Sequence, residues 1–292
     1  MIPLAVEVHE ARYYERVADQ TVVCKLCPHG CHIHPGHSGL CMGRVNHDGR
    51  LIAESYGQIT SIALDPIEKK PLIRFFPGSR ILSVGSFGCN LNCDFCQNWT
   101  IAQRRAASEY YPPEVLVELA VQERVHGNIG LAFTYNEPLI TFEYVFDCSQ
   151  LAKKVGLQMV LVTNGMINPE PLLELLPLID AMNIDLKAFR PDFYHKICRG
   201  ELEAVKRTIA TCVGACHVEL TTLLIPGLND DEQEIDDLAR WVASLDRSVP
   251  LHLTRHHPAN RMAQPGPISL DRLDFLAGIA RRHLADVHLG NI

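Results

Sequence analysis

Three cysteines in one short loop are the most chemically specific feature of the sequence. Cys89, Cys93 and Cys96 follow the spacing C-x3-C-x2-C, and the next cysteine along the chain is Cys148. A four-iron cluster that only transfers electrons has a thiolate on each iron, whereas three thiolates leave one iron without a protein ligand. An iron with an open position can bind a substrate, so this loop is predicted to be an active site.

A second group of cysteines lies near the N-terminus, in a loop rich in Gly, His and Pro. Its members are Cys24, Cys27, Cys31 and Cys41. Thiolates presented on turns are typical of a small metal-held module, because metal–ligand bonds replace the core that such a segment lacks. We predict a second metal site, with a nearby histidine as the alternative to one thiolate. The choice between zinc, iron and a second iron–sulfur cluster stays open.

Length and charge narrow the class of protein. The 292 residues suffice for one large α/β domain with a small appendage. The formal net charge of −7 gives no indication of a nucleic acid or an anionic membrane as partner. Neither a signal peptide nor a stretch of ~20 apolar residues is present. We therefore expect a cytoplasmic protein, whose cysteines are metal ligands or buried thiols rather than disulfides.

The segments that position these residues follow an α/β pattern. Residues 1–75 are expected to form the Cys-rich module and a linker that ends in a lead-in strand, and 76–292 the main domain. In the main domain, short apolar runs alternate with amphipathic segments, which is typical of a parallel sheet with crossover helices. The predicted strands are 81–87, 130–135, 158–164, 181–186, 217–225 and 250–255. The predicted helices are 113–126, 139–155, 169–178, 199–214, 230–245 and 269–284.

Polar residues follow the predicted strands, where α/β enzymes of this kind place their chemistry. The candidate ligand-binding residues at these positions are Asn136, Glu137, Thr163, Asn164, Asp185, Lys187, His252, Arg255 and His257. The alternative for the three charged side chains at 137, 185 and 187 is a set of internal ion pairs. The alternative for either histidine is a hydrogen-bonded core residue.

The sequence resembles radical S-adenosylmethionine (SAM) enzymes, whose three-cysteine motif usually has an aromatic residue before the third cysteine, here Phe95. Within that class it resembles the radical SAM member of the AmmeMemoRadiSam system, which is similar to pyruvate formate-lyase activating enzymes. This resemblance is carried by Cys24-x2-Cys27-Pro-His, the block 88–99, Tyr-Asn-Glu-Pro at 135–138 and the terminal Gly-Asn. Such relatives often continue with a C-P-x-C-G ribbon that is absent from this sequence.

The resemblance implies a partial (β/α)6 barrel that holds a [4Fe–4S] cluster and SAM. It implies that Glu137 binds the SAM amine, although Tyr135 and Asn136 replace the glycines usual in that motif. It further implies that Asp185 contacts the ribose hydroxyls and Lys187 the carboxylate. Phe95 and residues 287–291 would flank the adenine, and the other strand-end residues would contact SAM or substrate.

The implied reaction is reductive cleavage of SAM to a 5′-deoxyadenosyl radical, with an electron from a low-potential donor such as flavodoxin or ferredoxin. The resemblance suggests that this radical activates a partner enzyme by forming a glycyl radical. The alternatives are radical modification of a small molecule or peptide, a non-catalytic iron–sulfur electron carrier, and a scaffold with zinc at both cysteine groups. The sequence does not specify a substrate.

Overall fold

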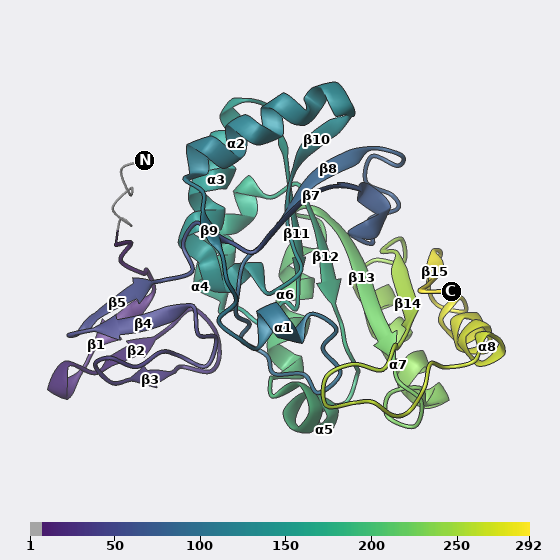
Figure 1. The fold of residues 1–292 in the computed structure, drawn as a ribbon. Coiled ribbons are helices and arrows are strands. Elements are labelled where there is room, and N and C mark those ends of the chain that lie inside the picture. Colours follow the sequence, from purple (N-terminus) through teal and green to yellow (C-terminus); the bar gives the residue numbers. More distant parts are fainter. Residues whose placement is uncertain (1–7) are drawn as a thin grey trace.

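An eight-stranded sheet organises the chain in the computed structural model, which describes residues 8–292 (Figure 1). The strand order is β15-β14-β13-β12-β11-β10-β8-β7, and all neighbours from β8 to β15 are parallel. The parallel strands are β8 (Arg80–Gly85), β10 (Asn128–Phe133), β11 (Gln158–Thr163), β12 (Ala181–Asp185), β13 (His217–Leu224), β14 (Leu251–Arg255) and β15 (Val287–Gly290). The antiparallel edge strand is β7 (Ser61–Pro66).

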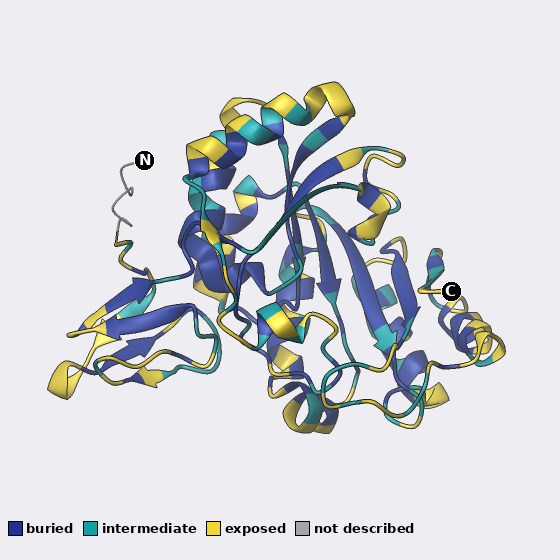
Figure 2. Cartoon of the chain, in the orientation of Figure 1, coloured by how far each residue is buried: buried dark blue, intermediate teal, exposed yellow. Residues whose placement is uncertain are grey.

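This sheet confirms the predicted α/β class, and each of the six predicted strands is present within about two residues. Strand β15 is an addition, because four residues with the sequence Val-His-Leu-Gly are too short to give a clear strand pattern. The sheet has two edges, β7 and β15, and is therefore an open, partial barrel. Figure 2 shows the strands of the main sheet as the most buried layer, with exposed residues on the outer helices, the connecting loops and the N-terminal module.

The crossover helices cover the outer face of the sheet (Figure 1). They are α2 (Pro113–Gln122), α3 (Phe142–Lys154), α4 (Pro169–Leu175), α6 (Leu202–Cys212), α7 (Glu232–Leu245) and α8 (Leu270–Ala280). Short helical turns precede or extend them, namely η2 (Ile67–Lys69), α1 (Trp99–Ala102), η3 (Glu123–His126), η4 (Pro138–Thr141), η5 (Leu176–Leu178), α5 (Pro191–Phe193) and the π-helix η6 (Tyr194–Cys198).

A side-chain cap sets one helix start, and a residue with a left-handed backbone sets another. Asp231 accepts a hydrogen bond from the backbone amide of Glu234 at 3.1 Å, which begins α7 close to its predicted start. The predicted helix 199–214 begins late, at Leu202, because Arg199 adopts a left-handed backbone with φ of 61° after the π-helix.

The N-terminal residues form a small β module beside the barrel (Figure 1). A three-stranded antiparallel sheet contains β1 (Tyr14–Arg16), β2 (Val22–Cys24) and β3 (His32–Ile33), with the 3-10 turn η1 (Ala18–Gln20) between the first two. A hairpin follows, made of β4 (Arg44–His47) and β5 (Arg50–Ala53). The short strands β6 (Gln58–Ile59) and β9 (Glu109–Tyr110) then pair with each other. The expected lead-in strand is β7, which joins the main sheet before residue 75.

A buried ion pair fastens this module to the barrel. Arg44 is 1% exposed, and its Nη2 donates to both carboxylate oxygens of Glu143 on α3, at 2.6 and 2.8 Å. The same guanidinium donates to the carbonyl oxygens of Ile140 and Arg12. Because a buried charge is costly unless paired and fully hydrogen-bonded, these contacts define one docking position for the module.

In the part of the chain that the structure describes, no helix has the length and apolar character needed to cross a membrane.

Candidate active-site cavity

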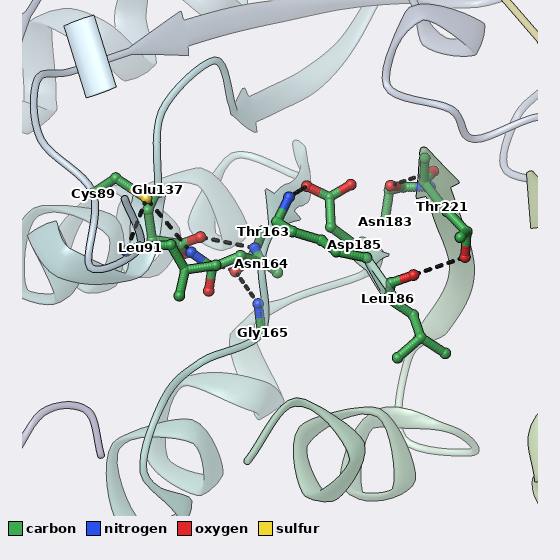
Figure 3. Close-up of polar contacts among 12 residues, drawn as sticks. Cys89, Leu91, Glu137, Thr163, Asn164, Gly165, Asn183, Asp185, Leu186 and Thr221 are labelled. Carbon is green, nitrogen blue, oxygen red and sulfur yellow. Dashed lines mark hydrogen bonds and ion pairs between the residues drawn. The ribbon is translucent and has the colours of Figure 1, made fainter. Parts of the chain in front are cut away.

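A cavity of about 360 Å³ opens at the carboxyl ends of the strands. The three cysteines of the predicted loop line it, and the loops that follow β10, β11 and β12 supply the opposite wall. The predicted residues that line the cavity are Cys89, Cys93, Phe95, Cys96, Asn136, Glu137, Thr163, Asn164, Asp185 and Lys187. Figure 3 shows Cys89 and Glu137 on one side and Asp185 on the other. Parallel strands bring these positions together because their carboxyl ends share one edge.

The cysteine loop is held by segments distant in sequence. The backbone amides of Asn92 and Asp94 donate to the carbonyls of Cys198 and Ile197, at 2.9 and 3.1 Å. Arg261 donates from Nε to the Asp94 carboxylate and from Nη2 to the carbonyl and side-chain oxygens of Asn92, all within 2.9 Å. The loop is therefore preorganised by the π-helix and by the segment after β14.

Of the thiols of this loop, Cys93 is buried and Cys89 and Cys96 are half-buried. Burial raises the pKa of Cys89 well above its usual range and that of Cys96 to about 11. A hydrogen bond from the buried thiol of Cys198 instead lowers the pKa of Cys93. Bound metal ions would supply the positive charge that stabilises the thiolates in this setting.

The Glu137 carboxylate is the most buried acidic group of the cavity wall. Its Oε1 accepts from the Leu139 amide and the Thr163 hydroxyl, at 3.0 and 2.7 Å, and Oε2 accepts from the Asn164 amide at 2.8 Å. Burial raises its pKa to about 7 despite these donors. Each carboxylate oxygen accepts two hydrogen bonds, so Oε2 retains capacity for one donor from a ligand.

Asp185 and Lys187 form an ion pair on the facing wall, with Nζ 2.8 Å from Oδ2. Burial disfavours the ammonium of Lys187, but Asp185 outweighs it and raises the lysine pKa. The Asp185 side chain is one-third exposed. Its second carboxylate oxygen has no hydrogen bond to another described residue and remains a free acceptor.

Asn136 and Tyr135 shape the cavity through the backbone. The Asn136 side chain accepts from the Ser86 amide and donates to the Gly88 carbonyl, both at 2.9 Å, so it fixes the start of the cysteine loop. Tyr135 has φ of 71°, a left-handed conformation that is uncommon outside glycine. Its carbonyl accepts from the Asn98 side chain at 2.7 Å. The glycine-like turn expected of this motif is thus made by a tyrosine.

Three predicted residues lie outside the cavity, which corrects the expectation that they share its wall. His252 is buried, with its Nε2 2.6 Å from Glu219 inside the barrel. Arg255 donates to the Ile268 carbonyl, and His257 is exposed beyond the strand. His252 lies on the same face of β14 as Thr254 but two residues further from the carboxyl end, whereas Arg255 lies on the other face, so of these residues only Thr254 lines the cavity.

An unpredicted polar group lines the cavity beside β7. Lys70 is 2% exposed, its Nζ lies 2.8 Å from Asp65, and Tyr135 donates to the same carboxylate at 2.7 Å. Burial acts to raise the pKa of Asp65, but these donors outweigh burial and lower that pKa to about 2. Both charged residues, Asp65 and Lys70, lie in the segment predicted to be a linker and lead-in strand.

Glu219 is a second unpredicted polar centre and has no exposed surface. It accepts from His217, His252 and the amides of Ile73 and Arg74, at 2.6 to 3.1 Å. Burial would raise its pKa, but these donors lower it to about 2. This group joins β13 and β14 to the loop after β7 below the cavity.

We expect Glu219 to contribute to stability in mildly acidic solution. Its folded pKa lies below the unfolded value of 4.5, so its contribution is present above pH 4.5 and is lost as the pH falls toward 2. Between pH 5.5 and 3.5 the free energy of unfolding of wild type should fall by about 1 kcal/mol more than that of Glu219→Gln. Urea unfolding of both apoproteins measures the difference, and parallel pH profiles would contradict it.

The four N-terminal cysteines line a separate, narrow cavity between the module and the cysteine loop. Burial raises the pKa of Cys27 to about 12 and that of Cys41 to about 11. Among residues 8–292, no three Cys, His, Asp or Glu side chains converge closely enough to bind a single metal ion. The four thiols of the predicted second metal site therefore line one cavity.

The main cavity fits a four-iron cluster with one open iron. It offers three thiols, and no fourth cysteine of residues 8–292 lines it. Cys198 contacts Cys93 from behind the loop and is not part of the cavity wall. The rest of the wall provides anionic, cationic and neutral polar groups for a zwitterionic ligand with hydroxyls.

Comparison with known proteins agrees with this geometry. The Radical SAM superfamily model matches residues 83–241, more than half of the chain. An uncharacterised protein of Methanocaldococcus jannaschii is 38% identical, with 98% of this chain and 86% of that protein aligned.

Two relatives with named reactions cover only part of the chain. The GTP 3′,8-cyclase of Geobacter sulfurreducens is 30% identical over 63% of this chain and 59% of the enzyme. The pyruvate formate-lyase-activating enzyme of Streptococcus mutans is 26% identical over 62% of this chain and 72% of the enzyme. With its three-thiol cavity and the family match, the chain belongs to the Radical SAM superfamily, whose members use a [4Fe–4S] cluster and S-adenosylmethionine.

Proposed function

We propose that Cys89, Cys93 and Cys96 hold the [4Fe–4S] cluster and that the cavity beside them binds SAM for reductive cleavage. Held by these cysteines and reduced, the cluster would supply the one electron that breaks the S–C5′ bond of SAM, which would give methionine and a 5′-deoxyadenosyl radical. The observation that carries the proposal is the convergence of three thiols and the groups of the facing wall in one cavity.

The residues of the wall orient SAM in this proposal. Glu137 accepts from the SAM ammonium at its free Oε2 position, and Asp185 accepts from the ribose hydroxyls. Lys187 donates to the SAM carboxylate while remaining paired with Asp185. Phe95 is buried, with its ring 5.9 Å from the Lys187 Nζ, and packs against the adenosyl part. Thr163 and Asn164 hold the Glu137 carboxylate in place.

Anaerobic assays of the reconstituted protein test this function. With dithionite and SAM, wild type should form 5′-deoxyadenosine and methionine in equal amounts, measured by liquid chromatography. Adding SAM should also change the electron paramagnetic resonance (EPR) spectrum of the reduced cluster. Lys187→Met should raise the SAM concentration needed for half-maximal activity. A reduced cluster whose spectrum ignores SAM, with no 5′-deoxyadenosine formed, would instead favour an electron carrier.

The proposed use of the radical is activation of a partner enzyme through a glycyl radical. The similarity to a pyruvate formate-lyase-activating enzyme over 62% of this chain supports this choice. The test incubates the reduced protein and SAM with pyruvate formate-lyase. A glycyl doublet in the EPR spectrum is expected. Cleavage of SAM without a doublet would count against this partner.

A second candidate is radical modification of a small molecule. It is favoured by the higher identity to GTP 3′,8-cyclase and by a cavity volume within the range of small-ligand sites. GTP is the first probe. Accelerated 5′-deoxyadenosine formation together with a new GTP-derived product would select this candidate over partner activation.

A further inference from the structure

The N-terminal cysteine cavity directly adjoins the active-site loop. Cys24, Cys27, Cys31 and Cys41 line it together with Asn90, which belongs to the loop between Cys89 and Cys93. The Nε2 of His29, within the Cys27–Cys31 turn, lies 2.7 Å from the Asn90 carbonyl. The four thiols and the active-site loop therefore share a wall.

A second contact brings the two groups of cysteines closer. Gly88 has φ of 88°, and a Cβ placed on it would lie 2.2 Å from the Cys41 carbonyl oxygen. Only glycine permits this approach. The Cα of Gly88 is one bond from this Cβ position, and the Cα of Cys89 is about 3.8 Å from the Cα of Gly88. The Cys41 carbonyl oxygen therefore lies within roughly 8 Å of the Cys89 Cα. Redox groups held by Cys41 and Cys89 would be close enough for electron tunnelling.

The spacing of the four thiols suits a group larger than one ion. They surround one cavity, yet no three of the potential ligands within residues 8–292 converge on a point. Cys89, Cys93 and Cys96 likewise line one cavity without converging on a point, and they lie in the loop where this superfamily carries an iron–sulfur cluster. A zinc ion needs ligands at about 2.3 Å from one centre, whereas a cluster separates its thiolates.

We propose that Cys24, Cys27, Cys31 and Cys41 ligate a second [4Fe–4S] cluster that relays electrons to the active-site cluster. The relay role rests on the proposed function, while the second cluster itself does not. Arg44 supports the arrangement, because its buried pair with Glu143 fixes the module against the barrel. Four thiolates close all four irons, so this cluster has no position for SAM.

The electron balance is simple. A low-potential donor protein, such as reduced flavodoxin, gives one electron to the oxidised N-terminal site and is itself oxidised by one electron. The same electron passes to the active-site cluster and is consumed when the S–C5′ bond of SAM breaks. The N-terminal site returns to its oxidised state, and no proton is transferred in the relay.

Metal analysis tests the second cluster independently of the active site. The experiment uses Cys89→Ser/Cys93→Ser/Cys96→Ser in the full chain, reconstituted anaerobically with iron and sulfide. About four iron and four sulfide per chain are expected, with no zinc, and about eight of each in wild type. One zinc without sulfide would overturn the proposal in favour of a structural ion. No bound metal in this variant would overturn it as well.

The relay is tested in Cys24→Ser/Cys27→Ser/Cys31→Ser, which keeps the active-site cysteines. Formation of 5′-deoxyadenosine should be lost with flavodoxin as the donor and retained with titanium(III) citrate, which reaches the active-site cluster directly. A SAM-responsive EPR signal in this variant shows that the barrel is folded. Full activity with flavodoxin would overturn the relay. If neither wild type nor variant cleaves SAM, the proposed function fails, and the metal analysis still decides the second cluster.

Discussion

Replacing Cys89 or Cys96 with alanine is expected to reduce 5′-deoxyadenosine formation to the background without protein. Two remaining thiolates cannot hold a four-iron cluster that also keeps one iron open. The cluster is the group that delivers the electron, so no other residue of the cavity can replace its chemistry. Liquid chromatography of the reaction and EPR of the reduced protein measure the two losses together.

Two cysteines outside the cavity wall, Cys216 and Cys198, provide the controls. Cys216→Ser changes a half-buried thiol just before β13, at the opposite end of the strand from the cavity, and should leave activity unchanged. The activity of Cys93→Ala is compared with that of Cys93→Ala/Cys198→Ala, because the Cys198 thiol contacts Cys93 and is available as a substitute ligand. Retention of SAM cleavage in Cys89→Ala would show that the cluster is bound elsewhere.

Breaking the buried pair between Arg44 and Glu143 should be strongly destabilising. Arg44→Met leaves the Glu143 carboxylate buried without its cation and removes the donors to the Ile140 and Arg12 carbonyls. We expect the free energy of unfolding to fall by about 3–5 kcal/mol, the usual cost of a buried charge that loses its partner. Urea unfolding followed by fluorescence gives this value.

An exposed pair within the same module is the matched control. Arg50 and Glu10 are 2.8 Å apart, but both side chains are more than one-third exposed. Arg50→Met should therefore change the free energy of unfolding by less than about 1 kcal/mol. The double variant Arg44→Met/Glu143→Gln should recover part of the loss, because no unpaired charge remains. Equal effects of Arg44→Met and Arg50→Met would refute the role of burial.

The fold was predictable from the sequence because its signals are local. Apolar runs of strand length alternating with helical patterns indicate parallel β-α units wherever they occur. The observed strands β8 to β14 accordingly match their predicted ranges. Strand β15 escaped prediction because a four-residue strand is too short to show a period.

The candidate site was partly predictable for the same reason. Parallel strands place the residues after β10, β11 and β12 at one edge, so Glu137, Asn164 and Asp185 line the same cavity as the cysteines. The prediction failed at His252 and Arg255, within β14, where position along the strand and its two faces decide which side chain reaches the cavity. The predicted end of a strand does not by itself say which of its last side chains face the cavity.

The sequence by itself determined the α/β class, the three-cysteine loop and the acidic and basic groups that follow the strands, since these depend on residue type and spacing. Only the tertiary structure decided that Glu219 captures His252, that Lys70 reaches the cavity, and that Cys41 packs against Gly88. Each of these contacts joins residues far apart in the chain. Their formation depends on strand register and on the docking of the module through Arg44, which no local pattern encodes.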